Sequence, residues 1–282
     1  MLTPRPDFPD APQAAALPSP DGTAPLEVAP GLPLDVPATV AEPPHAPVMT
    51  RGRAIAETIL CSSYPTQIVA AALLAGLGVA PQDSAGGLNA AFVFAVSVLD
   101  AVMVVGLIVW LLRRQGESLA AVFLGDRPPW REAAVGVALV PLVTLGVALT
   151  VLAARTLLPS LHNVAVNPLT SFMSDPLMAA AFAVIVVAAG GVREEMQRAF
   201  QIHRLSRHVC PPLVALLLTS LAFGLGHTIQ GRDVALATFG LGLLWGALYL
   251  RRRSLVAAAV SHGLFNLGQV LVGWAASRVA MP

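Results

Sequence analysis

The chain has 282 residues, of which 56% are hydrophobic and only 12% are charged, with a mean hydropathy of +0.72. An ordinary soluble domain carries about 25% charged residues, so the composition excludes that class and predicts a protein that lies mostly in a bilayer. The formal net charge is +1, and arginine without lysine occurs in small scattered groups, which excludes the basic surface that nucleic-acid binding requires.

Residues 1–50 differ from the rest of the chain in composition. Prolines recur every few residues from Pro4 to Pro47, and no apolar run there is long enough for the core of a helix or strand. We therefore expect a disordered tail, followed by a membrane domain over residues 51–282. The first residues lack the basic segment and compact apolar run of a cleavable signal peptide, so the tail is expected to stay attached.

From residue 51 onward, apolar segments alternate with short polar loops, and a spanning helix needs about 20 apolar residues. This pattern predicts an all-α, polytopic membrane bundle of about seven transmembrane helices. The expected spans cover residues 55–80, 90–112, 133–157, 177–207, 212–229, 234–250 and 255–279. Pro65 interrupts the first, which is therefore expected to be kinked or preceded by an interfacial helix.

The placement of arginine predicts the orientation, because basic residues in short loops stay on the cytoplasmic side. With the amino terminus inside, most arginines of the membrane domain fall inside, and only Arg155, Arg232 and Arg278 fall outside. We therefore expect a multi-pass protein of the cell (inner) membrane with a cytoplasmic amino terminus. His203 and His208 flank arginines at a cytoplasmic helix end and are expected to form a solvated basic surface.

Polar side chains recur inside the later apolar segments. These residues are Glu194, Glu195, His227, His262 and Asn266. At membrane depth such groups cost several kcal/mol unless they face a partner or a water-filled cavity, so they indicate a functional site. At about 1.5 Å of rise per residue, the glutamates and both histidines fall within about 10 Å of one another in height. The segments that carry them are therefore expected to line one cavity.

Spacing within each segment sharpens this expectation. Phe223 with His227, and His262 with Asn266, are i and i+4 pairs, so each histidine has a neighbour on its own helix face. The two members of each pair are therefore expected to be stacked about one turn apart on the same face.

Charged residues around the glutamate pair are expected to be partners of one another. Adjacent Glu194 and Glu195 diverge by about 100° around a helix, so one faces the histidines and the other a different helix or Arg198. Arg198 stands four residues after Glu194 and three after Glu195, in reach of either carboxylate. Asp100, alone in the second span, is expected to be a structural partner of another polar group.

Taken together, Glu-Glu with a following Arg, then Phe-x-x-x-His, then His-x-x-x-Asn resemble the CPBP (Abi) family of intramembrane proteases. This family includes the type II CAAX prenyl endopeptidases. The resemblance covers about residues 55–280, with the catalytic core at about 176–270. It departs at one position: the family's first motif reads Glu-Glu-x-x-x-Arg, whereas here Arg198 comes one residue early and Ala199 stands at the arginine position.

The resemblance implies an intramembrane endopeptidase, a CAAX prenyl protease type of hydrolase, that cleaves a membrane-anchored peptide or protein. A carboxylate in a low-dielectric cavity suits a general base near neutral pH. Glu194 is predicted to activate water with help from His227, while His262 and Asn266 hold the oxyanion. Glu195 is the supporting carboxylate, although the two glutamates are exchangeable at this stage; Arg198 and Phe223 support the site.

The family's description as metalloproteases leaves a zinc ion as a possible cofactor, held by Glu194, His227 and His262. The residues alone do not choose between a metal-bound and a metal-free water. No HExxH motif occurs, which disfavours a zincin site.

Two other classes stay open. A catalytically inactive family member would act as a membrane scaffold or immunity factor, with the polar cluster stabilising the bundle. A small transporter would use the acidic and imidazole groups to relay protons, but we find no internal repeat of the kind that transporters show.

Overall fold

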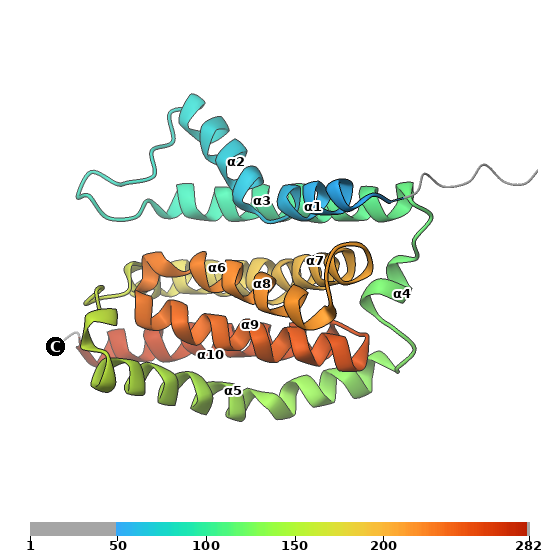
Figure 1. The fold of residues 1–282 in the computed structure, drawn as a ribbon. Helices are drawn as coiled ribbons and strands as arrows, with labels where there is room; N and C mark the ends of the chain where they lie inside the picture. Colours follow the sequence, from blue (N-terminus) through green and yellow to red (C-terminus); the bar gives the residue numbers. More distant parts are fainter. Residues whose placement is uncertain (1–48, 281–282) are drawn as a thin grey trace, which may run out of the picture. The chain divides into compact units, whose positions relative to one another are not determined.

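The structure, a computed structural model, describes residues 49–280 (Figure 1). These residues form helices joined by turns and loops, without a regular strand among them, which confirms the all-α fold class. The predicted tail, residues 1–50, lies almost wholly outside the described residues. The helical elements are α1 (Arg51–Leu60), α2 (Tyr64–Gly76), α3 (Ala90–Arg114), α4 (Leu119–Phe123), α5 (Pro129–Leu157), η1 (Pro159–Leu161), η2 (Pro168–Met173), α6 (Pro176–Ile185), η3 (Val186–Arg193), α7 (Glu194–His208), α8 (Pro212–Leu225), η4 (Thr228–Gln230), α9 (Arg232–Arg252) and α10 (Val256–Ala280).

Among the described residues, five helical stretches are long and apolar enough to cross a bilayer: α3, α5, the continuous stretch Pro176–His208, α9 and α10. Helices α1 and α2 form a pair bent by 40° that adds a sixth span if counted as one. The predicted count of seven is not confirmed. Helix α8 has only 14 residues, about 21 Å of helix against a hydrocarbon core of about 30 Å.

The α1–α2 corner, residues 61–67, is the predicted interruption of the first span. The helix breaks before Pro65, which occupies the first turn of α2. Ser63 has a φ of 68°, a left-handed backbone that is uncommon for a residue with a side chain. Its hydroxyl donates to Gln197 Oε1 at 2.8 Å and accepts from Arg193 Nη1 at 3.0 Å. Contacts with the Pro176–His208 stretch therefore hold this strained corner.

A π-helical segment, η3, lies within the Pro176–His208 stretch, directly before Glu194. Such segments are rare and occur frequently at functional sites. A methyl group on Gly191 would lie 2.7 Å from the Gly263 Cα of α10, so these glycines allow the two backbones to approach closely. Helix α10 consequently packs along η3 as well as along α5, while α8 packs along α9 (Figure 1).

Side chains on the outside of the spanning helices are apolar and exposed, as a lipid-facing surface requires. On α5, for example, Leu142 is 58% and Leu149 55% exposed. Near helix ends, guanidinium groups lie over indole rings in three pairs: Arg114 over Trp110, Arg131 over Trp130 and Arg278 over Trp274. Tryptophan and arginine are typical anchors at membrane interfaces, so these pairs agree with helices that end there.

A buried ion cluster joins α7 to α1 and to the loop after α3. Arg204 is fully buried and donates to Glu57 Oε2 at 2.9 Å and to Glu117. The expectation that His203 is solvated is wrong, because its side chain is 6% exposed and its Nε2 lies 2.5 Å from Glu117 Oε2. Burial by itself raises the pKa of Glu117, but hydrogen bonds from His203 and Arg204 outweigh it and lower the pKa to about 2.

Candidate active site

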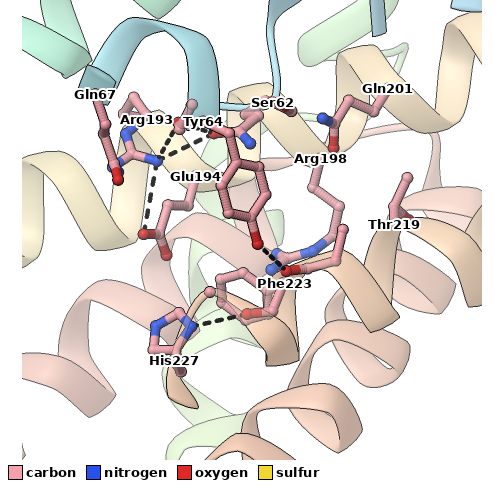
Figure 2. Close-up of a pocket in the computed structure, with 14 residues that line it drawn as sticks. Ser62, Tyr64, Gln67, Arg193, Glu194, Arg198, Gln201, Thr219, Phe223 and His227 are labelled. Atoms are coloured by element: carbon pink, nitrogen blue, oxygen red, sulfur yellow. Dashed lines mark hydrogen bonds and ion pairs between the residues drawn. The ribbon is translucent and has the colours of Figure 1, made fainter. Parts of the chain in front are cut away.

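A polar cavity of about 120 Å³ lies where the α1–α2 corner meets α7 and the carboxyl-terminal end of α8 (Figure 2). A single water needs roughly 10–15 Å³ of such space, so the cavity has room for several. Its lining includes the predicted residues Glu194, Arg198, Phe223 and His227, but not Glu195, His262 or Asn266. The other lining residues are Ser62, Ser63, Tyr64, Gln67, Arg193, Gln197, Gln201, Thr219, Ala222 and Gly226.

Glu194 is the first residue of α7, and its carboxylate points toward His227 (Figure 2). Its Oε1 lies 3.6 Å from Arg193 Nη1, and its Oε2 lies 3.8 Å from His262 Nε2. Both distances exceed those of direct hydrogen bonds. The carboxylate oxygens therefore remain available to a water molecule or a substrate in the cavity.

Glu195 turns away from the cavity, as the rotation between adjacent helical residues requires. Its side chain is 2% exposed and accepts hydrogen bonds from Arg198 and from His262 Nδ1, the latter at 2.8 Å. The indole of Trp245 stacks on the His262 ring with centroids 3.9 Å apart and planes at 19°. A carboxylate and an aromatic face thus fix the orientation of His262 from two directions.

His227 lies just beyond the end of α8, on the link to α9, and not within a span as predicted. Its Nδ1 is 2.8 Å from the Phe223 carbonyl oxygen. A carbonyl oxygen only accepts, so Nδ1 carries the hydrogen, and in the neutral ring Nε2 keeps its lone pair. Within a membrane domain, irregular backbone is tolerated where it lines a cavity, and His227 lines this one.

Asn266 faces η3 and not the cavity. Its Nδ2 donates to the Val186 carbonyl oxygen at 3.3 Å. A methyl group on Gly190 would overlap this amide and would lie 3.8 Å from His262 Nε2. One turn of α10 therefore presents His262 and Asn266 side by side to the π-helical segment, as their spacing predicts.

The early arginine of the first motif has a structural reason. Ala199, at the position where the family has arginine, is 1% exposed and belongs to the apolar core around Phe200. Arg198, one residue earlier, points to a different side of the helix. It pairs with Glu195, and its Cζ lies 4.3 Å from the centroid of the Phe223 ring. The predicted charge pairing between Arg198 and a glutamate is present.

Sequence reasoning missed Arg193, a 7% exposed cation beside Glu194. Its Nη2 lies 3.1 Å from Asp100 Oδ2, which confirms the expectation that Asp100 is a structural partner of a polar group. An arginine in one apolar segment and an aspartate in another were a usable signal, because such charges are rarely buried unpaired. Trp245 and Tyr64 were not among the predicted site residues, because aromatic residues are common in apolar segments and at membrane boundaries.

The zinc ligands implied by the resemblance do not fit a metal ion in this arrangement. Within residues 49–280, no group of three or more His, Cys, Asp or Glu side chains is placed to hold one. The Phe223 carbonyl and Glu195 engage the Nδ1 atoms of His227 and His262, which leaves Nε2 of each ring without such a partner, so the misfit rests on the missing third ligand and not on the histidines themselves. The mechanism below therefore uses only the side chains of the protein.

Fold and cavity together define a multi-pass helical membrane protein whose polar site lies among its helices. Residues 176–268 match the family model described as "Type II CAAX prenyl endopeptidase Rce1-like", so this region is similar to that family. The predicted resemblance to the CPBP family is confirmed at this level. The match runs from the start of α6 into α10 and includes every predicted site residue. Searches of curated proteins and of solved structures gave no match.

Proposed function

We propose that the protein is an intramembrane endopeptidase that hydrolyses a peptide bond of a membrane-anchored substrate with water activated by Glu194 and His227. The observation that carries this proposal is the convergence of the Glu194 carboxylate and the His227 imidazole on one small polar cavity. Neither group is held in a close ion pair, since the nearest charged group to Glu194, the Arg193 guanidinium, lies 3.6 Å away. Both are therefore free to act on a molecule between them.

Water activation follows from the hydrogen-bonding capacity of the two groups. Glu194 accepts one proton of the bound water as general base, while the lone pair of His227 Nε2 accepts a hydrogen bond from the other. The water oxygen then attacks the carbonyl carbon of the scissile bond and forms a tetrahedral intermediate. The proton held by Glu194 passes to the leaving nitrogen as the C–N bond breaks, so one water yields one carboxylic acid and one amine.

His262 is proposed to stabilise the oxyanion of this intermediate, because Glu195 holds its Nδ1 and directs Nε2 toward Glu194. With its ring protonated, Nε2 donates to the developing charge, and the buried Glu195 carboxylate compensates the imidazolium. Asn266 takes part in the proposal as a second donor. To do so, its amide exchanges the hydrogen bond to the Val186 carbonyl for one to the intermediate.

The arrangement supports distinct roles for the adjacent glutamates. Glu194 lines the cavity with a side chain that is 18% exposed, whereas Glu195 is 2% exposed and bonded to both His262 and Arg198. A base must reach its water, and a supporting carboxylate must hold its histidine. We therefore assign the base to Glu194 and the support to Glu195.

Cleavage of anchored peptides tests the proposal. The purified protein in nanodiscs receives a library of fluorogenic peptides that carry a prenyl or transmembrane anchor. We expect cleavage by the wild type and a loss of about 10²- to 10⁴-fold in kcat for Glu194→Gln and for His227→Ala. Glu132→Gln is the matched control, because this buried carboxylate pairs with Arg252 away from the cavity.

The alternative of a non-catalytic family member makes the opposite prediction. If the wild type cleaves no peptide of the library, or if wild type and both site variants cleave equally, the hydrolytic proposal fails. A scaffold in which the polar cluster stabilises the bundle would then lose thermal stability, and no activity, on the same substitutions.

A further inference from the structure

The α1–α2 corner covers the cavity on the side opposite His227, and its two edges are held very differently. Its inner edge is fixed by buried polar contacts: Ser63 with Arg193 and Gln197, and Thr66 with Asp100. Release of these groups would leave several buried polar atoms without partners, at about 1–3 kcal/mol each. The inner edge is therefore rigid.

The outer edge is held by one side-chain hydrogen bond. The Tyr64 hydroxyl donates to the Ala222 carbonyl oxygen at 3.0 Å, so the ring spans the distance from the corner to the end of α8 beside Phe223 (Figure 2). This carbonyl also accepts the helical bond from the Gly226 amide at 3.1 Å. If the Tyr64 hydroxyl moves away, the Ala222 carbonyl keeps its hydrogen bond from the Gly226 amide. Tyr64 is 47% exposed, so its hydroxyl can bond to water instead. Opening this edge therefore leaves no buried polar group unsatisfied.

Building on the hydrolytic function proposed above, we propose that Tyr64 is the latch of a substrate entrance between α2 and α8. A peptide that displaces the Tyr64 hydroxyl from the Ala222 carbonyl reaches Glu194 and His227 along this edge. The latch lies directly over the cavity, because Tyr64 and Ala222 both line it.

The chemistry of the corner favours a peptide over an acyl chain as the occupant. Gln67, one turn after Tyr64 on α2, lines the cavity, and its exposed side-chain amide has no hydrogen-bond partner among the described residues. A side-chain amide both donates and accepts hydrogen bonds. The main chain of an extended peptide has groups that match it, whereas a hydrocarbon chain has none. The lipid-facing side chains of α2, such as Ile68 at 70% exposure, supply an apolar surface for the substrate's anchor.

Removal of the hydroxyl alone tests the latch. For the best-cleaved anchored peptide, Tyr64→Phe is expected to lower KM by roughly 2- to 10-fold with little change in kcat, because one hydrogen bond no longer opposes entry. The control is Tyr249→Phe, which removes the same kind of bond, from the hydroxyl to the Val122 carbonyl, in the buried core. This control is expected to leave KM unchanged. An unchanged or raised KM for Tyr64→Phe overturns the latch.

Photo-crosslinking identifies the molecule that occupies the entrance between α2 and α8, and it does not require cleavage of the peptide. Benzoylphenylalanine replaces Tyr64 in the Glu194→Gln background, and the same probe at Ile68 serves as the lipid-facing control. We expect a peptide adduct at position 64 and lipid adducts at position 68. Only lipid adducts at position 64, with peptide in excess, overturn the peptide entrance.

The two proposals fail separately. If the wild type cleaves and Tyr64→Phe behaves as the wild type, the latch falls and hydrolysis stands. If the wild type cleaves nothing but position 64 captures peptide, hydrolysis falls and the entrance stands. If the wild type cleaves no peptide and position 64 captures none, both proposals are overturned.

Discussion

His262 Nδ1 lies 2.8 Å from a carboxylate oxygen of Glu195, and this contact joins α10 to α7 behind the cavity. The second partner of Glu195 is Arg198, from its own helix. The Glu195 carboxylate is therefore shared between His262, which faces Glu194, and Arg198. Among the described residues, Arg198 contacts no other carboxylate.

This shared carboxylate predicts a graded effect for the two glutamates. Glu195→Gln is expected to lower kcat by about 10- to 100-fold, less than Glu194→Gln, because His262 keeps a neutral partner but loses the charge that supports its protonated form. Steady-state kinetics of both variants measure the difference. A larger loss for Glu195→Gln than for Glu194→Gln would reverse their roles.

Asn266 is predicted to matter less for activity than His262. Its amide is bonded to the Val186 carbonyl, so Asn266→Ala should reduce kcat by no more than about 10-fold and the free energy of unfolding by about 1 kcal/mol. His262→Ala should cost about 10²-fold or more in kcat. Side-by-side kinetics and thermal unfolding check this order, and equal losses in kcat would mean that Asn266 and His262 contribute equally to stabilising the oxyanion.

Close packing at η3 predicts the effect of a single methyl group. Gly190→Ala brings a methyl group onto the Asn266 amide, so it should destabilise the protein by about 1–3 kcal/mol and reduce activity. Gly106→Ala on α3 is the matched control, because nothing lies within 4 Å of its added methyl group. Helix propensity alone predicts that this control gains up to about 1 kcal/mol. Equal melting temperatures for the two variants would argue against close contact at Gly190.

The ion cluster of Glu57, Glu117, His203 and Arg204 predicts a pH dependence of stability. The pKa of Glu117 is lowered from 4.5 to about 2, so its carboxylate stabilises the folded state fully above about pH 4.5, and this contribution is lost as the pH falls toward 2. Thermal unfolding of wild type and Glu117→Gln between pH 2 and pH 6 isolates the effect. The wild type should be more stable by about 1–3 kcal/mol at pH 6, and the difference should shrink toward pH 2. A difference independent of pH would contradict the ion pairing.

Metal removal tests the zinc expectation directly. Since no triad of ligands forms among residues 49–280, we expect cleavage to survive dialysis against a chelator and zinc to be present at well below one equivalent. Elemental analysis and activity before and after chelation give the answer. One equivalent of zinc, with activity lost on chelation and restored by zinc, would mean that Glu194, His227 and His262 rearrange around the ion.

Most of the helices could be predicted from the sequence, because a bilayer imposes a minimum length on every apolar segment. The expected spans at 90–112, 133–157, 234–250 and 255–279 all appear as long helices. The expected span at 212–229 does not reach that length, because α8 ends at Leu225. The position at which α8 ends depends on its packing against α9 and on the cavity. A local sequence pattern contains no information about either.

The chemistry of the site was likewise visible in the residue types, since carboxylates and imidazoles are rarely placed among apolar residues without a partner. Their directions were not visible. The choice between Glu194 and Glu195 for the cavity depends on how η3 and α10 fit together around Gly190 and Gly191. Such fits are set by contacts between distant segments.

By itself, the sequence determined the membrane class, the helical fold and the set of residues that carry chemistry, because composition and hydrophobic length are local properties. Only the tertiary structure decided that Glu194 faces His227, that Arg193 pairs with Asp100, that His203 is buried and that Tyr64 reaches Ala222. Each of these depends on the rotation of one helix against another, which is fixed when the side chains of separate segments pack together.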